Sequence, residues 1–314
     1  MRRYGLIVLA LVFVLGCNKR IVLPSQSQSS ESQNTELSNQ LSKVDYAKSI
    51  AEYRTQRESK LKEPTGWLSL VGLYWLKEGI NSFGAADDNN IIIPGITTET
   101  IGAYQKTGDE IFFGKVEGVE VLDENGEPYL GGPVEMDYPY TVVSHQSLYW
   151  HIILRGDRYG LRLKDTLAET RINFKGINYF EPNEKYKFNA VVEPSTDSIN
   201  ITNVLGETSR VPVAAYLSFD IAEQYYSLAA LDEGGDSYFL IFSDESSAVE
   251  TYGGGRFLYP PKPCDTCLQM TTLDFNKSQN PPCAFTAFAT CPLPPKGNRL
   301  KVRMLAGERY VDPH

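Results

Sequence analysis

The chain has 314 residues, of which 42% are hydrophobic and 11% aromatic, and its formal net charge is −9. About 270 residues follow the polar N-terminal region, which is enough for one large domain or two small ones with a full core. The acidic balance argues against nucleic-acid binding, which needs a basic face, and against electrostatic docking on anionic lipid. We therefore expect no nucleic-acid partner.

The first residues predict a lipoprotein signal peptide. Arg2 and Arg3 precede an apolar run at 5–15, and Gly16-Cys17 follows directly. The run is too short to span the hydrocarbon core, which needs about 20 apolar residues. The residues at 14–16, Val-Leu-Gly, resemble a lipobox, although the usual leucine at its first position is valine here. The alternative is an ordinary cleavable signal followed by a chance cysteine.

We therefore predict that residues 1–17 comprise the signal peptide and the lipidated Cys17. Each buried methylene of an acyl chain contributes about 0.8 kcal/mol, so several chains on one cysteine give a stable anchor. Asn18 is not aspartate, so no local signal for retention in the inner membrane is present. We expect a lipid-anchored protein of the cell envelope, on the periplasmic or surface face of the outer membrane.

The next segments predict a tether and then a helix. Residues 18–41 are rich in Ser, Gln, Asn and Glu and contain no aromatic residue, which is typical of a disordered spacer. Ser42 is a good N-cap for a helix from about Ser42 to Leu61, and Pro64 with Gly66 ends it. The folded part is predicted to be a single β-rich domain at 42–314, with sub-parts at 66–165 and 166–314.

Beyond the helix the dominant hydrophobic period is two, which predicts strands. Many short strands with only one good helix indicate an all-β sandwich or barrel. The predicted strands are 140–144, 148–154, 160–164, 188–192, 198–201, 214–219, 238–242 and 300–304.

A proline-rich segment at 274–297 interrupts this pattern. Its five prolines exclude regular ladder pairing, yet Phe275, Phe285, Phe288 and Leu293 make it too apolar for a flexible linker. Long ordered loops of this kind are often functional. The segment therefore predicts either a packed loop that presents polar groups to a ligand or a plug that closes the end of a barrel.

Several long strings in the chain carry a family resemblance, and they lie at 66–76, 160–165, 179–180, 251–258, 273–277, 280–285 and 291–295. They resemble an uncharacterised bacterial and archaeal family, domain of unknown function 1684. The resemblance covers most of the chain from Trp67 to Glu308, and no activity of the family follows from it. In the usual family pattern, Asp-x-Thr-x-Gly precedes the Thr-Tyr-Gly string, but here residues 244–248 read Asp-Glu-Ser-Ser-Ala.

A second resemblance concerns the start of the β-rich part. Residues 79–84 and 90–94 are similar to the first strands of a forkhead-associated sandwich. That fold binds phosphothreonine through an arginine after the glycine, but Ala85 follows Gly84 here. The resemblance implies the fold of an N-terminal sandwich and does not imply phosphopeptide binding.

With Cys17 lipidated, four cysteines remain: Cys264, Cys267, Cys283 and Cys291. An even number in an oxidising compartment predicts two disulfides. The family pattern contains the second pair, and the resemblance therefore implies the local pairings Cys264–Cys267 and Cys283–Cys291. A Cys₄ zinc site, free thiols and a redox-active Cys-x-x-Cys are the alternatives, although the spacing is poor for zinc. We expect no metal and no cofactor.

A polar group in the last third of the chain is the candidate ligand or active site: Asp244, Arg256, Asp274, Asn276 and Asn280. Arg256 follows three glycines and is suited to bind a carboxylate or phosphate through two N–H groups. An internal ion pair between Arg256 and Asp274 is the structural alternative.

No motif specifies a reaction. We expect a domain that binds a small molecule or an envelope protein. The alternative is a hydrolase-like enzyme, with Asp244 and Asp274 as acid and base or with Cys283 as nucleophile.

Overall fold

The computed structural model describes residues 27–136, 140–264 and 269–310. The chain divides into two compact units, Met1–Tyr46 and Ala47–His314. Cys17 and the predicted signal peptide lie outside the described residues. None of the described helices is both long and apolar enough to cross a membrane.

The N-terminal helix is longer than the sequence predicts. Helix α1 runs from Ser27 to Leu61, so residues 27–41 are helical where we expected a disordered spacer. The whole run contains neither glycine nor proline, so no residue in it strongly opposes helix formation. The helix ends at Leu61, before Pro64, as predicted.

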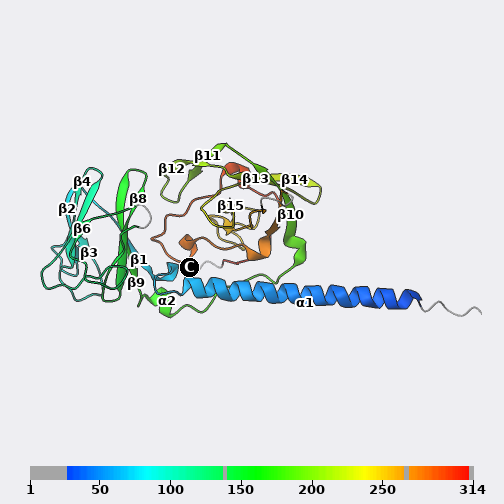
Figure 1. Ribbon diagram of the computed structural model, residues 1–314, viewed down its shortest axis with the longest axis horizontal. Coiled ribbons are helices and arrows are strands. Elements are labelled where there is room, and N and C mark those ends of the chain that lie inside the picture. Colours follow the sequence, from blue (N-terminus) through cyan, green and yellow to red (C-terminus); the bar gives the residue numbers. More distant parts are fainter. Residues whose placement is uncertain (1–26, 137–139, 265–268, 311–314) are drawn as a thin grey trace, which may run out of the picture. The chain divides into compact units, whose positions relative to one another are not determined.

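Residues 70–165 form two sheets, drawn in cyan and green in Figure 1. One has the strand order β1-β9-β8-β7, and the other has the order β3-β2-β4-β5-β6. The pairings are antiparallel except for β2 with β3, which is parallel. The strands are β1 Leu70–Trp75, β2 Gly79–Gly84, β3 Ile91–Ile92, β4 Gly102–Thr107, β5 Glu110–Lys115, β6 Gly132–Pro133, β7 Val143–His145, β8 Leu148–Arg155 and β9 Arg158–Asp165.

The two sheets share one hydrophobic core. Trp150 of β8 packs edge-on against Phe83 of β2, with 5.3 Å between the ring centroids. Its indole N–H donates to the hydroxyl of Tyr104 at 2.8 Å, so the polar atom of the buried ring is satisfied. This arrangement is a sandwich of two open sheets, and none of the sheets formed by the described residues closes into a barrel.

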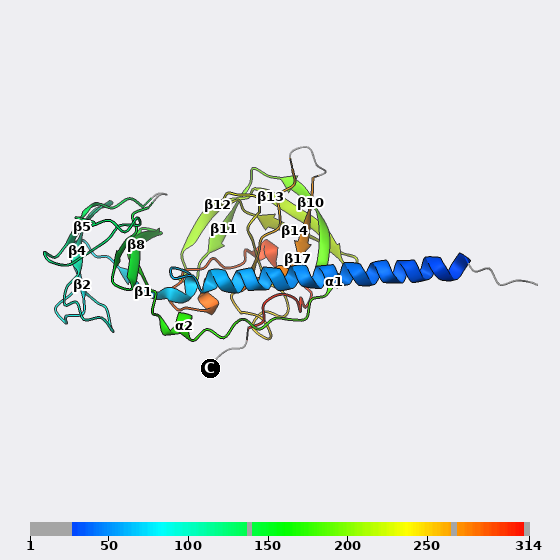
Figure 2. The ribbon, with the colours of Figure 1, turned by 60° about the horizontal axis from the view of Figure 1, so that its bottom comes forward.

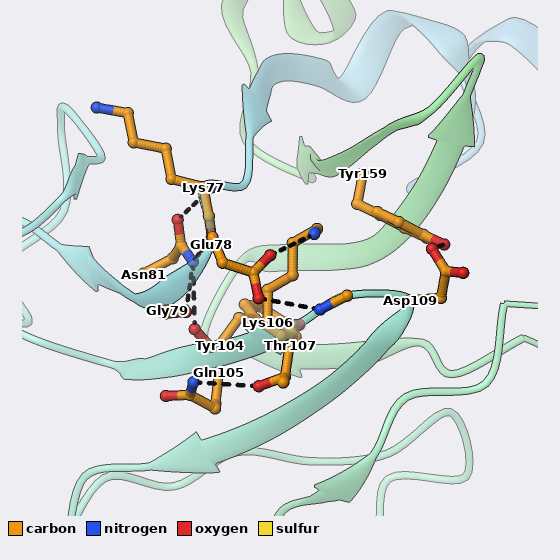
Figure 3. Close-up of polar contacts among 11 residues, drawn as sticks. Lys77, Glu78, Gly79, Asn81, Tyr104, Gln105, Lys106, Thr107, Asp109 and Tyr159 are labelled. Atoms are coloured by element: carbon orange, nitrogen blue, oxygen red, sulfur yellow. Dashed lines mark hydrogen bonds and ion pairs between the residues drawn. The ribbon is translucent and has the colours of Figure 1, made fainter.

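Polar contacts fix the turn between the two sheets (Figure 3). The buried Asn81 side chain accepts from the Lys77 amide and donates to its carbonyl, both at 2.8 Å. The Glu78 carboxylate accepts from the Lys106 ammonium at 2.8 Å and from the Gly108 amide at 2.9 Å. These bonds attach the β1–β2 turn to the β4–β5 hairpin.

Residues 166–310 contain the second β-rich part. Its main sheet has the order β14-β13-β10-β17, and two two-stranded sheets, β11–β12 and β15–β16, accompany it. The strands are β10 Lys187–Pro194, β11 Ser198–Thr202, β12 Thr208–Pro212, β13 Ala215–Ile221, β14 Gln224–Ala230, β15 Leu240–Phe242, β16 Arg256–Leu258 and β17 Met270–Asp274. Short helical segments accompany these strands: α2 Glu169–Ile172 and the 3₁₀ turns η2 Glu184–Tyr186, η3 Phe275–Lys277, η4 Pro282–Ala284 and η5 Lys296–Asn298. A further 3₁₀ turn, η1 Trp67–Ser69, directly precedes β1.

The predicted strand at 300–304 is not formed. Leu300 and Met304 are buried and Lys301 and Arg303 are exposed, so the predicted alternation is present. Residues 301 and 302 form a bend, and the segment makes only scattered backbone bonds to the chain near Ser243 instead of a regular ladder. Alternating burial is therefore achieved here without a strand partner.

Figure 2 shows the same elements from a second direction, with β10, β13, β14 and β17 adjoining one another as in the pairing order. The fold is thus mostly β with one N-terminal helix, as the sequence predicts, although the helix is longer than expected. Two aromatic cores support it, one around Trp150 and the other around Phe219, Phe242 and Phe275.

Candidate functional site

The predicted site residues Asp244 and Arg256 form a buried ion pair. Arg256 has 0% of its surface exposed, and its Nη2 donates to Asp244 Oδ2 at 2.7 Å and to the Met304 carbonyl at 2.9 Å. Its Nη1 donates to the Ala306 carbonyl. Burial lowers the pKa of the Arg256 guanidinium, and the Asp244 charge opposes that shift. We predicted Asp274 as the partner in the structural alternative, but the carboxylate that pairs with Arg256 is that of Asp244.

The second carboxylate oxygen of Asp244 is also used. Oδ1 accepts from the Ser246 amide at 2.8 Å and from the Met304 amide at 3.0 Å. The glycine before Arg256 has a positive φ of 85°, and a Cβ there would lie 2.6 Å from the Phe242 carbonyl oxygen. The pair therefore attaches the glycine turn to the C-terminal segment, and burial separates it from any ligand in solvent.

Asp274 and Asn276 form a second, separate buried group. The Asp274 side chain caps the 3₁₀ turn η3, since its Oδ1 accepts from the Asn276 amide at 3.2 Å. The Asn276 side chain accepts from the Asn183 amide and donates to its carbonyl, both at 2.9 Å. The arrangement positions residue 183 against the end of β17.

Asn280 lies elsewhere, on the wall of a cavity of about 250 Å³. Its amide N–H donates to Glu308 Oε2 at 2.7 Å, and its Nδ2 donates to the Arg309 carbonyl at 3.0 Å. Its buried Oδ1 has no hydrogen-bond partner. Of the five predicted residues, Asn280 is thus the one that reaches an open cavity, and the five do not converge on one site.

This open cavity, which we term the arginine cavity, is lined by residues of α1, of the β8–β9 pair and of the proline-rich segment, among others. It has a cationic wall of Arg57, Arg155 and Arg162 and an aromatic wall of Trp67, Phe239, Phe257 and Tyr259. Thr290, Cys291 and Pro292 contribute to it from the proline-rich segment. The segment predicted to face a ligand or to plug a barrel therefore lines a cavity beside a sandwich.

The alternation of β8 and β9 explains why the cations face this cavity. Paired residues of antiparallel strands point to the same side, and His151 pairs with Arg162. Trp150 and Leu163, which also pair with each other, point to the opposite side and into the sandwich core. One face of the pair is therefore apolar and buried in the sandwich, and the other carries the charges.

Burial and mutual repulsion characterise this charged face. Arg162 is 8% exposed, and burial together with the charge of Arg155 lowers its pKa to about 10. Burial and the nearby Arg162 likewise lower the pKa of Lys164 to about 8. Burial and three neighbouring cations lower the pKa of His151 to about 3, so the imidazole is neutral at neutral pH.

One hydroxyl and one carboxylate hold the three arginines. Thr290 Oγ1 accepts from Arg155 Nε at 2.9 Å and from Arg162 Nη2 at 3.4 Å. The Nε of Arg162 is buried and has no hydrogen-bond partner. Arg57 differs from both, because its Nε donates to the buried carboxylate of Glu308 at 2.8 Å.

A disulfide joins Cys283 and Cys291 within the proline-rich segment, with their Cα atoms 6.1 Å apart. This confirms the predicted pairing. A disulfide leaves neither sulfur as a thiolate, so it is incompatible with the Cys₄ zinc alternative and with Cys283 as a nucleophile. Cys267 lies outside the described residues, and the Cys264–Cys267 pairing stays a prediction.

Sequence reasoning did not select the cations of the arginine cavity. Arg162 occurs in the string at 160–165 only as part of the family resemblance, and Arg155 and Thr290 were not singled out. The available signal was the alternation at 161–164, Leu-Arg-Leu-Lys, on a strand with one buried face. Charges on the second face of a strand usually face solvent. The cavity on that face can be recognised only in the folded chain, where Thr290 lies beside Arg155 and Arg162.

Residues 172–309 match the family described as "Protein of unknown function (DUF1684)". Residues 172–309 therefore form a domain of this family. The predicted strings at 66–76 and 160–165 lie outside the matched residues. The cavity therefore combines Asn280 and Thr290 from the family domain with Arg155 and Arg162 from the preceding sandwich.

Among solved structures, the chain is similar to an uncharacterised protein of Haloarcula marismortui, whose structure was determined by NMR in solution. The two are 30% identical over 46% of this chain and 81% of the archaeal chain, with a TM-score of 0.39. No curated protein matches the chain.

Proposed function

We propose that the chain is a lipid-anchored protein of the cell envelope whose folded unit binds a small ligand in the arginine cavity. The open cavity of about 250 Å³ is the observation that carries the binding function. Ligand sites are concave and mostly apolar, with a few polar groups that converge on the ligand. The aromatic wall, the arginines and the unpartnered Asn280 Oδ1 fit that description.

The anchor is supported by the leader sequence. Two arginines, a short apolar run and Gly16-Cys17 together are typical of a lipoprotein signal. The outer membrane is the proposed location, because Asn18 supplies no retention signal. The membrane is then reached through acyl chains, and the acidic chain itself does not bind anionic lipid.

The hydrolase-like alternative has less support. It requires a substrate to reach Asp244, Arg256 and Asp274, but all three side chains are buried. Asp244 and Arg256 use their polar groups on each other and on backbone atoms of the C-terminal segment. Their arrangement supports a structural role.

The anchor is tested by replacing Cys17. We expect wild-type protein in the membrane fraction of expressing cells, with an N-terminal mass that includes acyl chains. The variant Cys17→Ser should lose the acyl mass. It should also leave the membrane fraction, either as the cleaved protein or as a soluble precursor. Wild-type protein without acyl mass would contradict the anchor.

The binding function is tested by native mass spectrometry of the full-length chain purified from its own cells. We expect a small molecule bound to the wild type and lost from Trp67→Ala, which removes part of the aromatic wall. Trp75→Ala is the matched control, because Trp75 does not line the cavity. A wild type that carries no ligand, or a ligand retained equally by both variants, would contradict binding in this cavity.

A further inference from the structure

We propose that the arginine cavity selects a small organic oxyanion, a carboxylate or a phosphate monoester, and that Arg155 and Arg162 bind its acidic group. The inference rests on the proposed binding function and specifies its ligand class. It concerns residues outside the matched family domain, which begins at residue 172.

The charge balance of the cavity is the first argument. Arg155 and Arg162 form no ion pair among the described residues, whereas Arg57 is neutralised by Glu308. Of the described residues that line the cavity, Glu233 is the one that carries a carboxylate. Burying an unpaired cation is strongly unfavourable, so a bound anion would stabilise this wall.

The second argument is an unsatisfied donor. Arg162 is more than nine-tenths buried and lines the cavity, and its Nε has no partner. Buried polar atoms are nearly always hydrogen-bonded in native proteins, so this N–H is a donor without its acceptor. A guanidinium donates most effectively to two oxygens of one carboxylate or phosphate.

The third argument is the arrangement of the two arginines. The single oxygen of Thr290 accepts from both guanidinium groups, at 2.9 Å and 3.4 Å, so it holds two like charges close together. This neutral hydroxyl orients the cations without cancelling their charge. Such preorganisation lowers the entropy lost when an anion binds.

The rest of the cavity defines the remainder of the ligand. Phe239 and Tyr259 stack with 5.4 Å between their ring centroids, and Trp67 lies under Arg162 at 5.5 Å from its guanidinium carbon. At about 250 Å³ the cavity is slightly smaller than the roughly 300–1,000 Å³ of typical ligand pockets, so it suits a small ligand. An acid group attached to one ring or a short aliphatic chain fits this space.

Calorimetry on the full-length chain in a non-ionic detergent tests the inference. The probes are phenyl phosphate, benzoate, inorganic phosphate and the neutral benzyl alcohol. We expect at least one of the two organic anions to bind at least tenfold more tightly than benzyl alcohol, and its affinity to fall as salt increases. Inorganic phosphate should bind more weakly than phenyl phosphate, because it does not contact the aromatic wall.

Two variants and a matched control assign the binding to the cavity. Arg162→Gln and Arg155→Gln should each weaken binding of the organic anion at least tenfold. Arg158→Gln removes the same charge from the same strand outside the cavity and should change affinity less than twofold. Thermal unfolding checks the fold, and Arg162→Gln should not lower the midpoint in the absence of ligand, since it removes an unpaired buried charge.

The outcomes separate this inference from the proposed function. Equal binding of benzyl alcohol and the anions, or anion binding that Arg162→Gln and Arg155→Gln leave unchanged, would overturn the oxyanion inference. A ligand found by native mass spectrometry that proves neutral would do the same and would leave the binding function intact. Absence of any native ligand would instead count against the binding function itself.

Discussion

At the residue scale, two buried arginines of this chain have opposite environments. Arg256 has a carboxylate and two backbone carbonyls as partners, and these compensate for its loss of water. Among the described residues Arg162 has no carboxylate partner and donates to the neutral Thr290 hydroxyl at 3.4 Å, while the buried Nε is without a hydrogen-bond partner in both arginines. A compensated charge holds a fold together, whereas an uncompensated one in a cavity is typical of a binding site. We therefore assign a structural role to Arg256 and, under the proposed function, a binding role to Arg162.

The first prediction concerns the compensated pair. Asp244→Asn should lower the free energy of unfolding by about 3 kcal/mol, because it leaves Arg256 charged and buried without a counter-ion. Urea denaturation followed by circular dichroism measures the change. Asp157→Asn, at an exposed position, is the control and should change stability by less than about 0.5 kcal/mol. Equal effects of the two variants would contradict the structural role of the pair.

At the scale of elements, the proline-rich segment is ordered and contacts both β-rich parts, although it belongs to the second. It contains the 3₁₀ turns η3, η4 and η5, and its Thr286 hydroxyl donates to the Leu70 carbonyl at 3.0 Å. The disulfide between Cys283 and Cys291 closes the loop that carries Thr290. Prolines restrict the backbone, and the disulfide restricts the loop further, so Thr290 is held beside Arg155 and Arg162.

The second prediction concerns this loop. The double variant Cys283→Ser, Cys291→Ser should lower the free energy of unfolding by roughly 2–3 kcal/mol, since a short cross-linked loop restricts the unfolded chain by about that amount. Urea denaturation under non-reducing conditions provides the measurement, with Ala284→Ser in the same loop as the control. If the oxyanion inference holds, the double variant should also bind the organic anion more weakly. Unchanged stability would show that the disulfide contributes little to the loop.

At the scale of the whole molecule, residues 47–314 behave as one compact unit with more than one core. The sandwich core and the core of the main C-terminal sheet are separate hydrophobic clusters. A third cluster joins them, because Leu70 of β1 packs there with Phe239, Phe257 and Ala289. The predicted sub-parts at 66–165 and 166–314 therefore share a buried interface, and the arginine cavity lies at that interface.

The third prediction concerns the N-terminal boundary of this unit. Deleting residues 1–46 should shift the thermal midpoint by less than about 2 °C, because Ile50, Arg57 and Leu61 remain in place. Deleting residues 1–62 should lower it by about 10 °C or more, since it removes two buried side chains and leaves the buried Glu308 carboxylate without Arg57. Differential scanning calorimetry compares the two truncations. Equal stability of both would show that α1 is not part of the folded unit.

Much of the fold was predictable because it depends on local patterns. Period-two hydrophobicity predicted strands such as β8 and β13, and Pro64 with Gly66 predicted the end of α1. The start of α1 was predicted too late, because polar composition indicates little core but does not prevent helix formation. The strand predicted at 300–304 was wrong for a related reason, since alternating burial requires only a buried face and not a ladder partner.

The candidate site was less predictable. Asp244, Arg256, Asp274 and Asn276 were selected as chemically capable residues, but the folded chain buries them in structural contacts. Asn280 reaches the cavity, and its neighbours there are different residues. No local pattern distinguishes an arginine that is paired internally from one that lines a cavity.

The sequence by itself determined the β-rich class and the C-terminal half and end of the N-terminal helix, the family resemblance implied the pairing of Cys283 with Cys291, and the leader predicted a lipid anchor at Cys17. These features depend on residues close together in the chain or on periodic burial. Only the tertiary structure decided which charges are compensated, because Thr290 meets Arg155 and Arg162 across 135 and 128 residues. Charge compensation depends on groups that come within a few ångströms of each other after folding, and sequence separation carries no record of those distances.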